Sequence, residues 1–182
     1  MPTLYLVRHG RAVAGWDRET DPGLDALGRE QAASLVRELN PLAPMDLIVS
    51  PLARTRETAA PLAAAWQVEP RIEPRVGEIP SPVSGLRERG LWLREIATRA
   101  WQQLDEPLRH WRGQVLAVLA ERDRDAIVVT HYIAINIAAG AAVGDDRVVN
   151  FQPDYCSVTV LRSVAGRLEL VRRGAEAATR VL

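Results

Sequence analysis

Three short runs of strand-forming residues, each leading into basic side chains, constrain the fold of this 182-residue chain more than any other feature. The runs are residues 4–7, 47–51 and 126–130. They lead into Arg8 and His9, into Arg54, and into His131. In open α/β sheets, ligands bind at the carboxyl ends of the strands. We therefore expect two imidazoles and two guanidiniums to meet at one edge of a sheet, where they can hold and transfer a phosphoryl group.

Helical patterns alternate with these strand patterns. The expected helices cover residues 25–40, 54–66, 86–119 and 133–142. The side chain of Asp25 suits an N-cap, so we expect it to begin the first helix. Pro61 is expected to kink or shorten the second helix, because proline removes a backbone donor. Breaks in the third helical region are expected near Pro107 and Gly113.

The end of the chain has the pattern of an antiparallel hairpin, with strands expected over residues 154–162 and 167–172. Residues 71–73 are expected to form a short edge strand. Together these patterns predict an α/β fold, a three-layer sandwich with a mostly parallel central sheet, helices on both faces and an antiparallel C-terminal hairpin. We expect a single domain over residues 1–182, with residues 81–112 as a small helical overhang near the pocket.

Composition narrows the possible functions. The 23 basic residues balance the 23 acidic residues, so no overall field attracts nucleic acid or an anionic membrane. All 23 of these basic residues are arginine, so phosphate contacts must come from arginine, histidine, hydroxyl groups or backbone amides. Cys156 is the single cysteine, which leaves no disulfide framework and no thiol zinc site. We expect it on a strand, as a small buried hydrophobic residue.

We also expect the protein to be cytoplasmic. No apolar stretch approaches the roughly 20 residues that are needed to cross a bilayer. The first strand begins so early in the chain that no room is left for a signal peptide.

His9 is the candidate nucleophile. A neutral imidazole is nucleophilic, and a reference pKa of about 6.5 leaves much of it neutral at cellular pH. An acceptor that fixes the proton on one ring nitrogen would leave the other nitrogen free to attack phosphorus. Arg8, Arg54 and His131 would neutralise charge on the phosphoryl oxygens, since this reaction depends on positioning and fixed charges. Arg54 could instead form a surface salt bridge, His131 could be a core or capping residue, and His110 is expected at the surface.

Four motifs together resemble the histidine phosphatase superfamily, also called phosphoglycerate-mutase-like, and they occur in that family's order. The motifs are LVRHG at residues 6–10, SPLAR at 50–54 followed by TA at 58–59, GEI at 77–79 and VVTH at 128–131. In addition, LDALGREQA at 24–32 is similar to the family's first-helix motif. The resemblance implies a phosphohistidine intermediate on His9. Arg8, Arg54 and His131 would complete the phosphate pocket. Glu78 would be the general acid that protonates the leaving oxygen and then activates water, although it could also be a solvated loop carboxylate. No metal or other cofactor is implied.

Several positions depart from the family pattern. Arg11 stands where the family commonly has Glu or Gln, and it could supply an extra cation or face solvent. Gly15 stands near the place of an Asn that often contacts phosphate in the family. Tyr132 follows the second histidine in place of Gly, and a positive φ would be strained there. Arg11, Tyr132 and Asn136 are therefore the candidate residues for contact with the rest of the substrate.

The leading interpretation is a metal-independent phosphomonoesterase for a small phosphorylated metabolite, with no nucleic acid or membrane partner. A phosphoglycerate-type mutase would return the phosphoryl group to the substrate, but the modest segment between Glu78 and His131 favours water access and hydrolysis. A phosphohistidine-protein phosphatase is a further alternative, against which Glu78 argues because a phosphoramidate needs less acid help. A non-catalytic phospho-ligand-binding module would account for the departures at Gly15 and Tyr132, but the intact His9 counts against it. The physiological substrate and the oligomeric state are left open.

Overall fold

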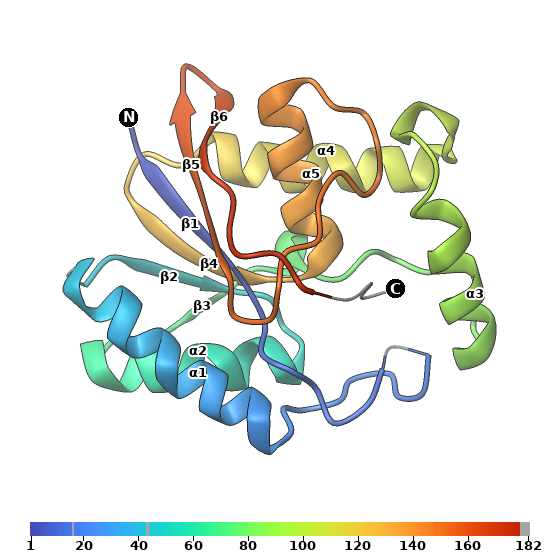
Figure 1. The fold of residues 1–182 in the computed structure, drawn as a ribbon. Coiled ribbons are helices and arrows are strands. Elements are labelled where there is room, and N and C mark those ends of the chain that lie inside the picture. Colours follow the sequence, from blue (N-terminus) through green and yellow to red (C-terminus); the bar gives the residue numbers. More distant parts are fainter. Residues whose placement is uncertain (16, 43, 179–182) are drawn as a thin grey trace.

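One mixed sheet of six strands runs through the computed structural model, which describes residues 1–182 except 16, 43 and 179–182 (Figure 1). The strands are β1 (Thr3–Arg8), β2 (Asp46–Val49), β3 (Arg71–Ile72), β4 (Ala126–Thr130), β5 (Val158–Val164) and β6 (Arg167–Arg172). Their order across the sheet is β3-β2-β4-β1-β5-β6. The pairs among β3, β2, β4 and β1 are parallel, whereas β5 runs antiparallel to β1 and to β6. The expected parallel core, short edge strand and antiparallel C-terminal hairpin are confirmed.

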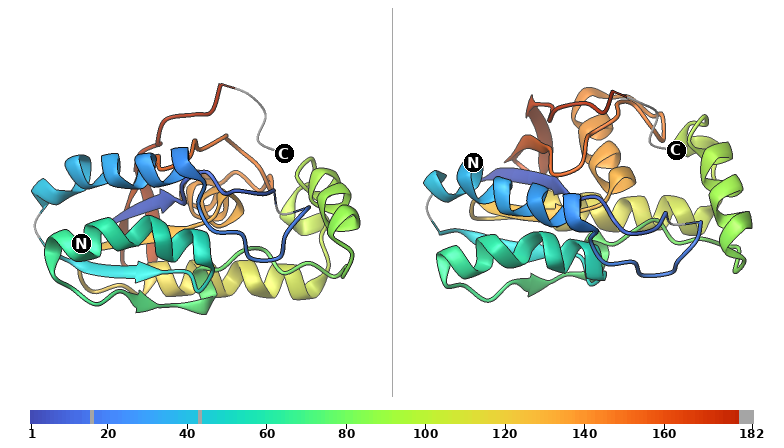
Figure 2. Two further views of the ribbon diagram at one scale, coloured as in Figure 1. Left: turned by 90° about the horizontal axis from the view of Figure 1, so that it is seen from below. Right: turned by 60° about the horizontal axis from the view of Figure 1, so that its bottom comes forward.

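Five α-helices surround the sheet in the described part of the chain. They are α1 (Ala26–Leu39), α2 (Ala53–Trp66), α3 (Leu86–Ile96), α4 (Glu106–Ala120) and α5 (Tyr132–Val143), with 3-10 turns at Asn40–Leu42, Pro74–Val76 and Trp101–Gln103. α1 and α2 pack on one face of the sheet, and α4 and α5 pack on the other (Figure 2). This arrangement confirms the three-layer α/β sandwich.

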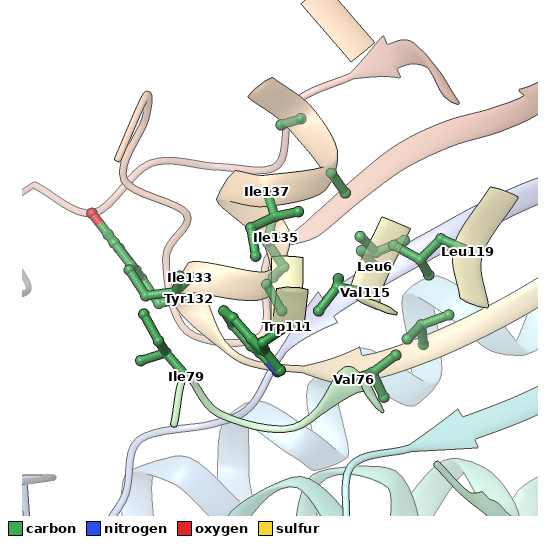
Figure 3. Packing of buried hydrophobic residues seen from close by; sticks show 14 of the residues in the cluster. Leu6, Val76, Ile79, Trp111, Val115, Leu119, Tyr132, Ile133, Ile135 and Ile137 are labelled. Carbon is green, nitrogen blue, oxygen red and sulfur yellow. The ribbon is translucent and has the colours of Figure 1, made fainter. Parts of the chain in front are cut away.

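Two hydrophobic clusters fill the spaces between the sheet and these helices. Val7 and Val129 belong to the cluster under α1 and α2, whereas their neighbours Leu6 and Val128 face α4 and α5. Successive strand residues point to opposite faces, so each strand contributes to both clusters. Figure 3 shows the second cluster, where α5 carries apolar side chains toward β1 and α4. None of the helices in the described residues combines the length and apolarity that a membrane span requires.

The local sequence signals predict some helix boundaries and miss others. Asp25 caps α1 as expected, since its Oδ1 accepts a hydrogen bond from Gly28 N at 2.7 Å. Pro61 does not shorten α2, because burial of the apolar face of this helix offsets one missing backbone bond. The helical region is broken just before Pro107, as expected, since α3 ends at Ile96 and α4 begins at Glu106, but the expected break at Gly113 is wrong. Pro107 lies in the first turn of α4, where its missing N–H costs nothing, and the helix continues through Gly113.

The region expected as an overhang lies in two different environments. α3 stands at one end of the molecule in both Figure 1 and Figure 2. Trp101 and Trp111, later in the same region, are buried in the core with their ring centroids 6.2 Å apart. From α3, Leu93 reaches a cavity at the end of the sheet.

Cys156 lies in a turn and not on a strand, so this part of the hairpin expectation is wrong. β5 begins only at Val158, and Cys156 is half-buried with a φ of 54°. The turn follows β1 closely, because Cys156 N donates to Arg8 O at 3.0 Å and Arg8 N donates to Ser157 O at 3.2 Å. Residues 175–177 run beside residues 152–154 and support the turn from outside.

Candidate active site

The carboxyl ends of β1, β2 and β4 meet at one edge of the sheet. β1 and β2 flank β4, and the hydrogen-bond ladder continues past the strands, since His9 N donates to Thr130 O at 3.1 Å. Ser50 N donates to the backbone of β4 in the same way. Arg54 joins these residues from the first turn of α2. The sheet therefore holds His9, Ser50 and His131 as neighbours.

Both ring nitrogens of His9 have a hydrogen-bond partner, one a carbonyl and the other a guanidinium. Nδ1 is 2.8 Å from Gly10 O, and Nε2 is 3.2 Å from Arg54 Nε. A carbonyl only accepts hydrogen bonds, so the ring proton is on Nδ1 and the lone pair is on Nε2. Burial lowers the pKa of His9 well below its usual 6.5, and Arg54 and Arg8 lower it further. The imidazole is neutral, and its lone pair on Nε2 accepts the hydrogen bond from Arg54 Nε.

Gly10 holds the acceptor of this hydrogen bond in place. Its N–H donates to Thr58 Oγ1 at 2.9 Å, and Thr58 Oγ1 donates to Arg54 O at 2.6 Å. A Cβ on Gly10 would lie only 2.7 Å from Gly28 O in α1. The loop after β1 therefore meets α1 and α2 at a point where only glycine fits.

Arg8 is buried between two aromatic rings. Its guanidinium carbon lies 3.9 Å from the ring centroid of Tyr155 and 5.1 Å from that of Tyr132. Nη1 donates to Pro153 O at 2.9 Å. Its Nε is buried and has no hydrogen-bond partner among the described residues. Ring stacking and one carbonyl thus fix the guanidinium. Its Nε–H remains available to donate a hydrogen bond to an anion.

Arg54 connects the other groups of the site. Its Nη2 lies 3.2 Å from Glu78 Oε2 and 3.3 Å from His131 Nδ1. Its Nη1 is buried without a hydrogen bond to any described residue, and Asp21 Oδ1 is 3.9 Å away. The start of α2 adds the positive end of a helix dipole. Arg54 is only 3% exposed, so the alternative of a surface salt bridge is wrong.

His131 is completely buried between a hydroxyl and a carboxylate. Its Nε2 is 2.7 Å from Ser50 Oγ, and its Nδ1 is 3.4 Å from Glu78 Oε2. Burial lowers the pKa of His131 well below 6.5, and the charge of Arg54 lowers it further. The other oxygen of Glu78 accepts a hydrogen bond from Ile79 N at 3.1 Å. The carboxyl is therefore held beside both Arg54 and His131.

Arg8, His9, Arg54 and Glu78 share one cavity of about 120 Å³, whereas His131 is not among its described lining residues. Its lining consists of Arg8, His9, Arg54 and Glu78 together with Ala12, Ala14, Gly15, Pro22, Leu93, Tyr132, Ile133 and Tyr155. The ring centroids of His9 and His131 are 5.3 Å apart. A nucleophile, two cations and a carboxyl around one enclosed space can bind a phosphoryl group and transfer it.

The donors around this cavity suit an anion, because two guanidiniums and a helix N-terminus bring positive charge to it. In the part of the chain that the structure describes, no group of three or more His, Cys, Asp or Glu residues is placed to hold a metal ion. A larger groove of about 930 Å³ along α2 contains neither His9 nor His131. His9, Arg54 and Glu78 line the smaller cavity instead.

Two of the candidate substrate-contacting residues lie away from the cavity. Arg11 is half exposed, and its Nε pairs with Asp25 Oδ2 at 2.5 Å, so the start of α1 draws it away. Asn136 is completely buried, and its Oδ1 accepts a hydrogen bond from Asn150 N at 2.8 Å. It supports the segment that leads to the turn before β5. Tyr132, in contrast, lines the cavity from the first position of α5, with no positive φ. His110 lies on the exposed side of α4, as expected.

Ser50, Pro153 and Tyr155 belong to the site but were not among the sequence candidates. Ser50 directly follows β2 within one of the recognised motifs, so its position was a usable signal. Pro153 and Tyr155 gave no such signal, because their contact with Arg8 depends on how the turn before β5 folds against β1.

Comparison with known proteins agrees with this geometry. The family model of the histidine phosphatase superfamily (branch 1) matches residues 4–176. A protein named probable phosphoglycerate mutase GpmB, from Erwinia tasmaniensis, is 26% identical over 165 residues, which is 79% of this chain and 76% of that protein. Phosphoserine phosphatase 1 from Hydrogenobacter thermophilus is 32% identical over 116 residues, which is 61% of this chain and 51% of that protein. The same fold occurs in the crystal structure of a phosphoserine phosphatase from Entamoeba histolytica in complex with 3-phosphoglyceric acid, with a TM-score of 0.75. The two chains are 18% identical, and the match covers 96% of this chain and 98% of that chain.

Proposed function

The chain belongs to the histidine phosphatase superfamily, and we propose that it is a metal-independent phosphomonoesterase that acts on a small phosphorylated metabolite through a phosphohistidine on His9. The observation that carries this proposal is the state of the His9 ring. Gly10 O fixes the proton on Nδ1, and Nε2 keeps its lone pair, which accepts a hydrogen bond from Arg54 Nε at 3.2 Å in the cavity. This is the arrangement that a nucleophilic imidazole needs.

In the first step, His9 Nε2 attacks phosphorus. The N–P bond forms while the bond between phosphorus and the ester oxygen breaks. Glu78, in its protonated form, gives its proton to the leaving oxygen, so that a neutral alcohol departs. The contacts of Glu78 with Arg54 and His131 support this role.

In the second step, water attacks the phosphohistidine from the side that the alcohol has left. Glu78, now a carboxylate, takes a proton from this water. The N–P bond breaks, and inorganic phosphate leaves with His9 neutral again. The same carboxyl therefore serves as acid and then as base.

Arg8 and Arg54 stabilise the transferring group in both steps. Their buried and unpaired donors, Nε of Arg8 and Nη1 of Arg54, are available to the phosphoryl oxygens. His131 supports them, since its Nδ1 lies 3.3 Å from Arg54 Nη2 and its Nε2 is hydrogen-bonded to Ser50 Oγ. These charges and dipoles are fixed before the substrate binds, so little reorganisation is needed in the transition state.

A mutase that returns the phosphoryl group to its substrate is the second candidate, favoured by the similarity to the probable phosphoglycerate mutase. Hydrolysis is preferred because α3 contributes only Leu93 to the lining of the cavity, which leaves little structure to exclude water. Incubation of the labelled phosphoenzyme with excess 3-phosphoglycerate would distinguish the two. Release of the label as inorganic phosphate supports the phosphatase, and transfer to the added ester supports the mutase.

The first test is hydrolysis of an activated aryl phosphate in the presence of EDTA, by the wild type and by His9→Ala. We expect turnover by the wild type and none by the variant, with an unchanged circular dichroism spectrum. Equal turnover by both proteins would refute the mechanism. Binding of phosphate without turnover by either protein would favour a non-catalytic binding module.

A further inference from the structure

Beyond the phosphoryl-binding groups, the described residues that line the cavity carry mostly apolar and aromatic side chains, with no additional cation among them. From this lining we infer that the enzyme selects monoesters whose leaving alcohol is uncharged and apolar, and that it discriminates against leaving groups that carry a carboxylate. This inference rests on the proposed phosphatase function and specifies its substrate class.

The size of the cavity determines which walls the leaving group meets. A cavity of about 120 Å³ holds a phosphoryl group and few further atoms, since cavities for whole small ligands begin at about 300 Å³. The leaving group must therefore extend along the walls toward solvent. Leu93, Ile133 and Tyr132 form part of those walls, with Ala14 on the loop after β1.

The charges on the lining leave nothing to pair with a second anion. Among the described lining residues, the formal charges belong to Arg8, Arg54 and Glu78. Arg54 lies against His9 Nε2 at 3.2 Å, and Pro153 O and the Tyr155 ring hold Arg8. The remaining donors, Arg8 Nε and Arg54 Nη1, are the ones assigned above to the phosphoryl oxygens.

Arg11 and Tyr132 do not change this balance. Arg11 pairs with Asp25 and does not line the cavity. The phenol of Tyr132 stays neutral, because burial raises its pKa to about 12.

A neighbouring cavity of about 320 Å³ contains Arg89 but shares Glu78 with the reactive one. A leaving group that extends from one cavity into the other passes this carboxyl. A carboxylate on the leaving group would also be desolvated against Leu93 and Ile133 without a partner, which is unfavourable. Uncharged carbon atoms gain from the same contacts.

The test compares two esters that differ only at the far end of the leaving group. Glycerol 1-phosphate and 3-phosphoglycerate both carry the phosphoryl group on a primary alcohol, but the second ends in a carboxylate. We expect kcat/KM to be higher for glycerol 1-phosphate by about tenfold or more, the scale of one uncompensated group in a binding site. Benzyl phosphate, with an uncharged ring, should exceed both. Equal values for the pair, or a preference for 3-phosphoglycerate, would overturn the inference.

A variant with an added cation tests the assignment to the wall of the cavity. Ala14→Arg places a guanidinium on the lining, and Val13→Arg, at a neighbouring residue that is 59% exposed and outside the lining, is the control of equal net charge. We expect Ala14→Arg to raise kcat/KM for 3-phosphoglycerate relative to glycerol 1-phosphate by about tenfold, while Val13→Arg leaves the ratio near the wild-type value. An equal change in both variants, or in neither, would overturn the inference.

The failure of this inference and the failure of the proposed function give different results. Hydrolysis of the aryl phosphate that depends on His9, together with a preference for 3-phosphoglycerate, would overturn only the substrate class. Absence of turnover on every ester, the aryl phosphate included, would overturn the proposed function and the inference with it.

Discussion

Ser50 and His131 are joined by a hydrogen bond of 2.7 Å between Oγ and Nε2, and both side chains are fully buried. This bond fixes the orientation of the His131 ring relative to the His9 ring. The two ring centroids are 5.3 Å apart. Arg54 Nη2 lies 3.3 Å from His131 Nδ1 and can only donate, so Nδ1 accepts and the ring proton on Nε2 is donated to Ser50 Oγ. Ser50 is thus a positioning residue for His131.

Ser50→Ala should lower kcat by about tenfold or more with a smaller change in KM, because the tautomer and angle of His131 are no longer fixed. Ser157→Ala is the matched control, since Ser157 is also buried but its Oγ has no hydrogen-bond partner among the described residues. Steady-state kinetics on one aryl phosphate measures both variants. Similar effects of the two substitutions would make the role of Ser50 merely structural.

Arg54→Ala should lower kcat/KM, because it removes a fixed charge from the reacting centre. The decrease should correspond to a loss of at least about 3 kcal/mol of transition-state stabilisation. Arg11→Ala should change kcat/KM little, since Arg11 pairs with Asp25 and lies outside the cavity. The pair is compared by kcat/KM at constant ionic strength. An effect of about tenfold or less for Arg54→Ala would assign Arg54 to the fold and not to the reaction.

Glu78→Gln should slow esters of poor leaving groups far more than activated aryl esters. An alkoxide needs a proton to depart, whereas a nitrophenolate does not, and general acid catalysis contributes about a hundredfold or more. The measurement is the dependence of kcat/KM on leaving-group pKa for the wild type and for Glu78→Gln. A uniform decrease across all leaving groups would argue against the role of general acid.

The free energy of unfolding should decrease as the pH falls below 6.5. Burial lowers the folded-state pKa of His9 and of His131 well below this value, so the unfolded chain binds protons that the folded chain does not. Each histidine contributes a slope of up to about 1.4 kcal/mol per pH unit. This stability is fully present above the unfolded pKa and is lost as the pH falls toward the folded pKa. The paired carboxyl of Glu73 has its pKa lowered to about 2 from 4.5, so it acts only in a more acidic range.

Urea unfolding at about pH 7.5 and about pH 5.5 measures this slope. His9→Gln should reduce it by removing one buried imidazole, whereas replacement of the exposed His110 by Gln should not. A wild-type stability that is constant between these two values would show that the buried histidines have the same pKa in the folded protein as in the unfolded chain.

Gly10→Ala should destabilise the fold by about 1–3 kcal/mol, the usual cost of overpacking, because its Cβ would meet the backbone oxygen of Gly28 at 2.7 Å. It should also lower activity, since the carbonyl of residue 10 fixes the His9 proton. Gly113→Ala is the control: it lies in α4 with no atom within 4 Å of the added Cβ. This substitution should stabilise the protein by about 0.5–1 kcal/mol. Thermal unfolding measures the midpoint temperature of both variants. A Gly10→Ala variant with the midpoint temperature of the wild type would contradict the close packing at this position.

The strand patterns predict most of the fold because each apolar run is buried on both faces of the sheet and has one plausible structure. Pro61 predicts a shorter second helix, but α2 runs on to Trp66 because the free energy of packing this helix exceeds the cost of one lost hydrogen bond. The same strand ends predict the meeting of His9, Arg54 and His131. Tyr155 is not predictable in this way, since it reaches Arg8 only through the turn before β5. The sequence leaves Arg11 open between an extra cation for the substrate and a residue that faces solvent, because it does not show whether Asp25 or a substrate attracts this side chain more strongly. In the structure Arg11 is exposed and pairs with Asp25.

Identification of the phosphorylated atom tests the account most directly. The wild type would be mixed rapidly with a labelled aryl phosphate, quenched in base to preserve phosphohistidine, and digested to locate the label and its ring position. The account predicts label on Nε2 of His9 during turnover, and no label in His9→Ala. Label on Nδ1 of His9, on a different residue, or on no residue while the ester is hydrolysed would contradict it.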